Sequence, residues 1–239
     1  MLLDGSRVLV AGATGVIGAA VASGLVERGA RVAVAGRNPT RLAQHAADLG
    51  GVPASRIDAY DLDGCADLAH WAADRLGGLD AVVVTIGVAA FGPADTQPEP
   101  VTEHVFTVNA LAPIAVLRGA LAVRPTPGTL AAVTGVVAER PQRQMAAYSS
   151  AKAALSGWLT AVRAERRSQG TVVLDARLPH LDTGFADRAV AGTPPPLPRP
   201  VPLDETVDAL LEALESDAVL LAPNGTGGVT ADHRLPQPH

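Results

Sequence analysis

The chain has 239 residues, of which 48% are apolar and 18% are charged, and its formal net charge is −5. This composition excludes a disordered chain, and the acidic balance argues against nucleic acid or an anionic membrane as a partner, since both require a basic face. The longest apolar stretches, 81–91 and 110–117, are shorter than the ~20 residues of a spanning helix, and the first residues do not resemble a secretory signal. The single cysteine excludes an internal disulfide. We expect one cytoplasmic domain covering residues 1–239, and the abundance of Ala and Arg is typical of a bacterial genome rich in G and C.

Predicted strands and helices alternate along the chain. The strands are expected at 7–11, 31–35, 57–60, 79–84, 128–134, 171–178 and 219–222. The helices are expected at 19–28, 39–49, 103–123, 145–167 and 204–215. This alternation is typical of βαβ units, so the sequence predicts an α/β fold, a Rossmann-type doubly wound parallel sheet with helices on both faces. Six prolines between 193 and 202 predict a stiff surface loop, and residues 223–239 are expected to form a loose C-terminal tail.

A glycine-rich turn, Gly12-x-x-Gly15-x-x-Gly18, joins the first predicted strand to the first predicted helix. Without a Cβ atom, Gly12 can make the tight turn, Gly15 lets the backbone approach a diphosphate, and Gly18 lets the helix pack closely on the strand. The free N–H groups of the helix N-terminus then bind the diphosphate, and Thr14 and Ile17 belong to the same site. A tight turn without a ligand is the alternative, but the flanking strand and helix favour a dinucleotide.

Arg37 and Asn38 follow the second predicted strand. An enzyme that selects NAD usually has an acidic residue at this point, where it accepts hydrogen bonds from the ribose hydroxyls. A guanidinium would instead pair with a 2′-phosphate. An ordinary exposed arginine is the alternative, because the chain has 18 arginines. The sequence therefore favours NADP (NADPH) as the cofactor, with NAD as the second possibility.

Tyr148 and Lys152 lie four residues apart in the predicted helix 145–167, so both side chains share one helical face. A neighbouring ammonium favours the phenolate and lowers the pKa of a tyrosine, which makes the tyrosine a usable general acid and base. Lys152 is the only lysine of the chain, although 18 arginines are present. A solvent-facing pair on an amphipathic helix is the alternative, and the unique lysine argues against it.

At this point the sequence resembles the short-chain dehydrogenase/reductase family, from residue 2 to about residue 215. The resemblance is carried by an ordered set of residues: Gly12, Gly15, Gly18, Arg37, Asp61-Leu62, Gly87, Asn109, Tyr148-x-x-x-Lys152 and Pro179. It implies that Tyr148 protonates a carbonyl oxygen as hydride arrives from the nicotinamide, and that Lys152 holds the nicotinamide ribose.

The resemblance implies further roles outside the tyrosine–lysine pair. Asn109 would anchor a water chain that relays protons. Asp61 and Leu62 would contact the adenine, Gly87 would let the backbone pass close to the adenine ribose, and Pro179 would lie beside the cofactor.

The chain departs from the family pattern at several positions. The family's usual pattern, Gly-x-x-x-Gly-x-Gly, would place its second glycine at position 16, where the chain has Val16 and the glycine is at 15. The serine that orients the substrate is expected thirteen residues before the tyrosine, where the chain has Gly135. Thr134 could supply the missing hydroxyl, although a shift of one residue in a strand reverses the face of the side chain. His180 replaces a family glycine and either reaches the substrate or faces solvent.

These observations predict an NADPH-dependent carbonyl reductase or alcohol dehydrogenase that acts on a small-molecule carbonyl or alcohol substrate. Residues 180–202 would form the substrate loop. Two alternatives remain: a dinucleotide-binding regulator without turnover, and a non-redox enzyme such as an epimerase, dehydratase or cyclase. The histidines show no metal-ligand spacing, so no metal site is expected. The helical stretch 151–162 is apolar or small almost all round, which predicts a homo-oligomer, either a homodimer or a homotetramer.

Overall fold

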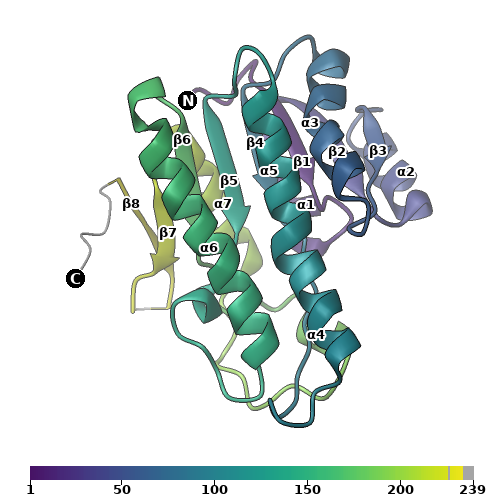
Figure 1. Ribbon diagram of the computed structural model, residues 1–239. Coiled ribbons are helices and arrows are strands. Elements are labelled where there is room, and N and C mark those ends of the chain that lie inside the picture. Colours follow the sequence, from purple (N-terminus) through teal and green to yellow (C-terminus); the bar gives the residue numbers. More distant parts are fainter. Residues whose placement is uncertain (226, 234–239) are drawn as a thin grey trace.

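The structure is a computed structural model, and it describes residues 1–225 and 227–233. One continuous sheet of eight strands forms its centre (Figure 1). The strands are β1 (Arg7–Ala11), β2 (Arg31–Gly36), β3 (Ala54–Arg56), β4 (Ala81–Val84), β5 (Thr129–Val133), β6 (Val172–Ala176), β7 (Leu220–Pro223) and β8 (Val229–Asp232). Their order is β3-β2-β1-β4-β5-β6-β7-β8, and every pair is parallel except β7 with β8. This topology confirms the predicted doubly wound parallel sheet.

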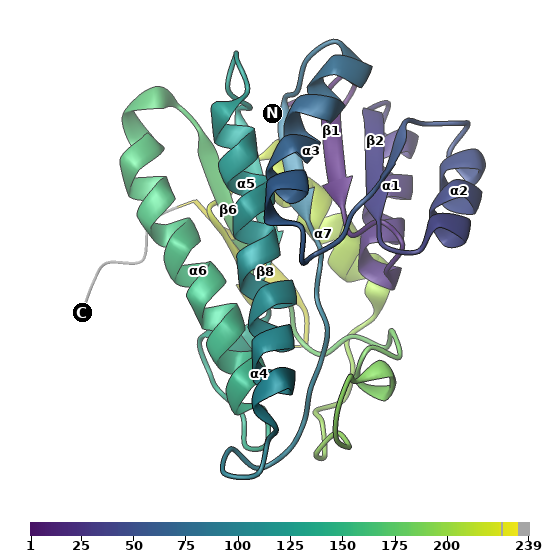
Figure 2. The ribbon, with the colours of Figure 1, turned by 45° about the vertical axis from the view of Figure 1, so that its right-hand side comes forward.

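Helices cover both faces of the sheet, as predicted (Figure 2). They are α1 (Val16–Glu27), α2 (Pro39–Asp48), α3 (Leu62–Leu76), α4 (Glu99–Phe106), α5 (Ala112–Ala122), α6 (Ala146–Arg166) and α7 (Leu203–Glu215). Alternate residues of β1 point to opposite faces, since Val8 and Val10 pack with α1 and α7, whereas Leu9 packs with α3, α5 and α6. Each central strand is therefore buried on both sides, which explains its continuous apolar sequence.

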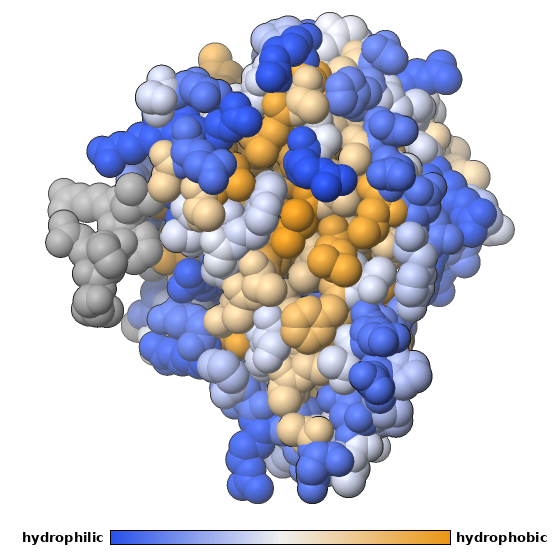
Figure 3. Space-filling model, viewed as in Figure 1, coloured by the Kyte–Doolittle hydropathy of each residue, from blue (hydrophilic) through white to orange (hydrophobic). Residues whose placement is uncertain are grey.

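A π-helical turn, Thr107–Leu111, joins α4 to α5, so residues 99–122 run as one interrupted helix. This helix is long and apolar enough to cross a membrane by length and composition alone, and 61% of its most apolar window is buried inside the protein. Burial of that kind is typical of a core helix, and α5 packs closely against α3. On the surface, apolar side chains gather in a band over the helical face that includes α5 and α6 (Figure 3).

Two sequence predictions were wrong at the edges of the sheet. The third strand covers 54–56 rather than 57–60, because the chain turns at Asp58 and reaches the first residue of α3 four positions later. The predicted loose tail contains an edge strand, β8, which pairs antiparallel with β7 through a turn closed by Asn224 and Gly228. The last predicted tail residues, 234–239, lie outside the described residues.

Candidate active site

A cleft of about 1460 Å³ opens where the parallel strands end. The sheet winds outward in both directions from β1 and β4, and ligands of open α/β sheets bind at such a reversal point, beyond the carboxyl ends of the strands. The cleft is larger than the pocket of a typical small molecule, so a dinucleotide and a second small molecule fit in it together. The predicted cofactor residues that line it are Gly12, Thr14, Gly15, Ile17, Gly18, Arg37, Asn38, Gly87, Tyr148, Lys152 and Pro179.

The glycine turn brings three backbone segments together. Gly12 has a φ of +105°, and a Cβ atom there would lie 2.6 Å from Oγ1 of Thr85. A Cβ atom at Gly18 would collide with the carbonyl oxygen of Gly12. Gly15 differs, because a Cβ atom there would meet only that same oxygen, at 3.4 Å, and it caps α1 without a side-chain hydrogen bond. The first N–H groups of α1 therefore remain available beside the cleft, as diphosphate binding requires.

Two arginines that line the cleft follow β2, rather than the single arginine predicted from the sequence. Arg37 is exposed and lines the cleft, as does Arg41 in the first turn of α2. The Asn38 side chain accepts a hydrogen bond from the backbone N–H of Arg41 at 3.0 Å, so its amide oxygen caps the helix. Sequence reasoning missed Arg41, although an asparagine directly before Pro39 is a usable N-cap signal that places Arg41 in the first turn of a helix.

Asp61 and Leu62 do not line the cleft. The Asp61 carboxylate accepts a hydrogen bond from the Gly64 N–H at 2.9 Å and caps α3. Asp58 and Ala59 occupy the cleft wall instead. The third strand ends earlier than predicted, and the contact of Asp61 and Leu62 with the adenine stays a prediction.

Asn109 lies in the π-helical turn and is fully buried. Its amide nitrogen donates to the carbonyl oxygens of Val88 and Val105, at 3.0 and 2.9 Å, and its amide oxygen accepts from the Val88 N–H at 3.1 Å. Both N–H donors of the amide are therefore used. The side chain braces the segment after β4, and its role in anchoring a water chain stays a prediction.

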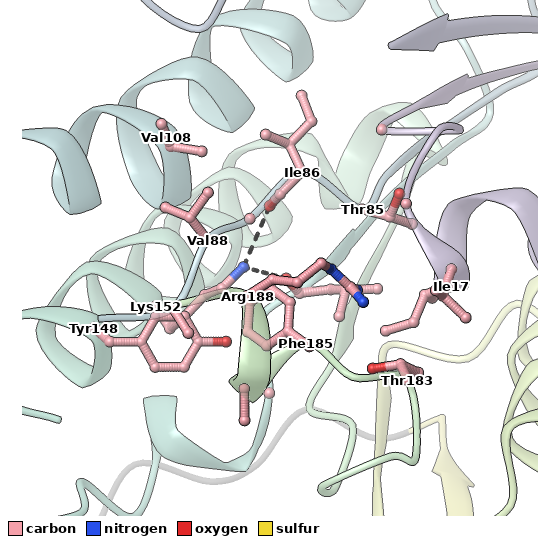
Figure 4. Close-up of a pocket in the computed structure, with 18 of the residues that line it drawn as sticks. Ile17, Thr85, Ile86, Val88, Val108, Tyr148, Lys152, Thr183, Phe185 and Arg188 are labelled. Atoms are coloured by element: carbon pink, nitrogen blue, oxygen red, sulfur yellow. Dashed lines mark hydrogen bonds between the residues drawn. The ribbon is translucent and has the colours of Figure 1, made fainter. Parts of the chain in front are cut away.

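Lys152 is 3% exposed and lies between the ends of two strands. Its Nζ donates to the carbonyl oxygen of Val133 at 2.9 Å and to that of Ile86 at 3.5 Å (Figure 4). These bonds use two of the three ammonium donors. Burial lowers the pKa of Lys152 to about 8, and the nearby carboxylate of Asp175 partly opposes this shift. Gly87 lies next to the ammonium, since a Cβ atom there would be 3.3 Å from Nζ.

Tyr148 packs its ring against Phe185, with 6.0 Å between the ring centroids (Figure 4). Burial raises the pKa of the Tyr148 phenol above its usual value near 10. The expected lowering of this pKa by Lys152 is thus absent, because desolvation dominates at this position. Tyr148 is consequently protonated at neutral pH, the form that donates a proton.

The Thr134 side chain does not replace the missing serine. Thr134 is fully buried, and its hydroxyl donates to the carboxylate of Asp175 on β6 at 2.5 Å. The same carboxylate accepts hydrogen bonds from the hydroxyl of Ser156 at 2.6 Å and from Nε of Arg177 at 3.0 Å. Gly135 has a φ of +91°, a conformation that a serine would rarely adopt. The position where the family has its serine therefore presents no hydroxyl to the cleft.

The loop 178–198 forms the remaining wall of the cleft. Pro179 and His180 both line it, and His180 is half-buried at the edge of the cleft. Two further arginines, Arg143 and Arg188, line the cleft on the side of Tyr148. Sequence reasoning missed both, since each lies in an irregular loop without a motif.

Comparisons with known proteins agree with this geometry. A family model described as short chain dehydrogenase matches residues 6–191. A short chain dehydrogenase from Pseudocercospora fijiensis is 29% identical over 71% of this chain and 58% of its own length. A cyclic-di-GMP-binding biofilm dispersal mediator protein from Escherichia coli is 30% identical over 64% of this chain and 63% of its own length. The chain thus spans less than two thirds of the length of either relative.

A solved structure shares the fold along almost the whole chain. The alcohol dehydrogenase from the archaeon Thermococcus sibiricus, complexed with 5-hydroxy-NADP, superposes with a TM-score of 0.78 at 21% identity. The match covers 98% of this chain and 100% of that chain.

Proposed function

The chain belongs to the short-chain dehydrogenase/reductase family, and we propose that it is an NADPH-dependent oxidoreductase that reduces the carbonyl group of a small molecule or oxidises the corresponding alcohol. The single observation that carries this proposal is that Tyr148 and Lys152 line the same cleft as the glycine turn. An acid–base pair and a phosphate-binding turn in one cleft are the parts that hydride transfer to a carbonyl needs.

The residues of the cleft fit a nicotinamide dinucleotide. The glycine turn and the N-terminus of α1 would hold the diphosphate, since no side chain fills the space at Gly15. Arg37 and Arg41 would hold a 2′-phosphate, which supports NADPH over NADH. Asp58 and Ala59 would lie beside the adenine, and Lys152 beside a ribose. When bound, NADPH supplies a hydride to the carbonyl carbon.

The acid–base chemistry belongs to Tyr148 and Lys152. Tyr148 is protonated at neutral pH, so it can donate its proton to the carbonyl oxygen as the electron pair of the C=O bond moves onto that oxygen. Lys152 remains charged below its pKa of about 8, and its ammonium, which donates to the carbonyl oxygens of Val133 and Ile86, would hold the nicotinamide ribose beside Tyr148. Tyr148 then recovers a proton from solvent, and the cycle consumes one proton for each carbonyl reduced.

The second candidate is a dinucleotide-binding regulator that keeps the cleft without turnover. It is favoured by one observation, the absence of a hydroxyl at Gly135 together with the buried bond of the Thr134 hydroxyl to Asp175. One relative is named for binding a cyclic dinucleotide, which is compatible with this candidate. Such a protein would bind the cofactor but would not reduce carbonyl compounds.

Side-by-side titrations of the protein with NADPH and NADH test the proposal. We expect NADPH to bind at least about tenfold more tightly, because each hydrogen bond to a charged group contributes ~1.5–3 kcal/mol. A screen of ketones and aldehydes, followed by NADPH absorbance, then separates the reductase from the regulator. Binding of neither dinucleotide would contradict both candidates.

We further propose that the protein self-associates through the face that carries α5 and α6. Leu111 is 46% exposed at the start of α5, and Ile114 and Trp158 are only half-buried on the same face. Apolar side chains run across this face as a band (Figure 3). Light scattering would reveal a homodimer or homotetramer, and Trp158→Arg should shift it toward the monomer.

A further inference from the structure

Positive charge is concentrated in the cleft. The chain as a whole has 19 Lys and Arg residues against 24 Asp and Glu residues. The cleft wall, in contrast, includes five cationic side chains and one acidic side chain: Arg37, Arg41, Arg143, Lys152 and Arg188 against Asp58. An acidic protein with a basic cleft is suited to anionic ligands, because the cleft walls focus the local field.

The proposed cofactor accounts for only one part of this charge. Arg37 and Arg41 lie at the end of β2, where the 2′-phosphate would bind, and Lys152 lies beside the ribose. Arg143 and Arg188 lie elsewhere, in the two loops on either side of Tyr148, and the proposed cofactor contacts leave both of them unused.

Local contacts hold these two loops against Tyr148. Arg143 lies in the loop before α6, which is fixed to the chain after β4 by a hydrogen bond from the Gly92 N–H to the Gln144 carbonyl at 2.9 Å. Arg188 ends the short helical turn Ala186–Arg188, which follows directly on Phe185, the residue whose ring packs on Tyr148. Figure 4 shows the Arg188 side chain reaching into the cleft from this turn.

Neither guanidinium is neutralised within the part of the chain that the structure describes. The arginine ion pairs found there involve Arg7, Arg28 and Arg177. The rest of the wall around Tyr148 is mainly apolar and includes Phe91, Val137, Met145, Leu181 and Phe185. Two unpaired cations above an apolar floor favour a ligand with an anionic group and a hydrophobic body.

We propose that the substrate is a keto acid, or the hydroxy acid that corresponds to it, whose carboxylate is bound by Arg143 and Arg188. The proposal rests on the proposed oxidoreductase function and names its substrate class. A planar guanidinium matches a carboxylate in a two-pronged arrangement, and this bond would turn the carbonyl toward Tyr148. The two arginines would thereby orient the substrate, a role for which position 135 offers no hydroxyl.

The reaction balances without a further reagent. The carbonyl carbon gains a hydride as NADPH becomes NADP⁺, and the π electrons of the C=O bond move onto the oxygen. That oxygen takes the proton of Tyr148, so the product is a hydroxy acid with its carboxylate unchanged.

Matched acid and ester probes test the proposal. The pairs are benzoylformate with methyl benzoylformate, and acetoacetate with methyl acetoacetate. We expect the wild-type kcat/KM to be about 10- to 100-fold higher for each acid than for its ester, since a charge-assisted bond contributes ~1.5–3 kcal/mol. Arg143→Gln and Arg188→Gln should each remove most of this preference, mainly by raising KM for the acid, with much smaller changes in the ester rates and in the NADPH dissociation constant.

Arg140→Gln is the matched control. Arg140 is exposed in the same loop as Arg143 and lies outside the cleft wall, so its loss should leave the preference for the acid intact. Esters reduced as well as acids, or equal losses on both members of a pair, would overturn the proposal. Weaker NADPH binding by Arg188→Gln would overturn it for Arg188 and assign that residue to the cofactor.

Calorimetry separates failure of this proposal from failure of the proposed function. Benzoylformate is titrated into the wild type and into both arginine variants, with NADP⁺ and without it. Binding that depends on both arginines, in a protein that reduces no carbonyl compound, would support the carboxylate site and contradict the reductase. Reduction of neutral ketones without carboxylate binding would do the reverse.

Discussion

The two ends of the cleft are built from different parts of the chain. The end at β1 and β2 consists of strand termini, a helix N-terminus and glycines whose spacing is set by backbone contact. The end around Tyr148 consists of loops that supply side chains, including Arg143, Arg188 and Phe185. In the proposed enzyme, the first end would bind the phosphate groups of the cofactor, whereas the second would determine which compound reacts. Changes at the two ends should therefore separate cofactor affinity from turnover.

Tyr148→Phe should show the largest difference between its effect on turnover and its effect on cofactor affinity. Removal of a general acid typically costs about 10²- to 10⁴-fold in rate, so kcat should fall by that factor with the NADPH dissociation constant unchanged. Tyr60→Phe is the comparison, because the only other tyrosine lies in the cleft wall after Asp58 and Ala59 with its hydroxyl bonded to His104 at 2.7 Å, so its loss should change kcat far less. Full activity of Tyr148→Phe would show that the proton comes from another group.

Two glycine variants at the end of the cleft formed by β1 and β2 should affect protein stability and cofactor affinity separately. Gly18→Ala places a Cβ atom against the Gly12 carbonyl, and we expect the free energy of unfolding to fall by about 1–3 kcal/mol. Gly15→Ala meets only an ordinary contact, so its stability should be close to that of the wild type while its NADPH affinity falls. Urea denaturation and NADPH titration of both variants check this. Wild-type NADPH affinity in Gly15→Ala would contradict diphosphate binding at the turn.

Arg37→Gln should alter which dinucleotide is preferred and little else. Loss of a charged bond to the 2′-phosphate would weaken NADPH binding by about 10- to 100-fold and leave NADH binding unchanged. Arg41→Gln should have a similar but smaller effect, since its side chain begins one helical turn further on. Equal losses for the two dinucleotides would instead assign Arg37 to a general role in folding.

The most gradual effects are expected from pH. The pKa of Lys152 is lowered by burial to about 8, so the activating ammonium is lost, and kcat should fall, as the pH rises through 8. The free energy of unfolding should instead rise with pH. The unfolded chain keeps the Lys152 proton up to about pH 10.4, whereas the folded chain releases it near pH 8. Rising stability between pH 8 and 10, measured by urea denaturation, should be absent in Lys152→Met.

The comparison of the two ends also explains what could be predicted from the sequence. Strands β1, β2 and β4 to β7 lay within two residues of their predicted bounds at both ends, since a buried parallel strand has a continuous apolar sequence and a turn after it. The glycine turn was recognisable because backbone contacts fix its spacing. The third strand was misplaced, because Ala54–Arg56 contains no continuous apolar run and the chain already turns at Asp58.

The second end depends on contacts between distant parts of the chain. The Thr134 hydroxyl donates its hydrogen bond to Asp175, which lies 41 residues further along the chain, and no local sequence pattern reveals this contact. Arg143 and Arg188 lie in loops that line the cleft, and the backbone bond of Gln144 and the ring contact of Phe185 beside them have no sequence signature. Side chains that act through tertiary packing are the ones that sequence reasoning missed.

Because Lys152 is the only lysine, local opening of α6 can be measured by cleavage at a single site. A lysine-specific endoprotease has one cleavage point in this chain, the peptide bond after Lys152, within α6. Because this residue is 3% exposed and helical, cleavage requires local opening of α6. The appearance of fragments 1–152 and 153–239 would thus measure how often the helix opens. Slower cleavage in the presence of NADPH would measure, in the same experiment, how strongly cofactor binding holds the helix closed.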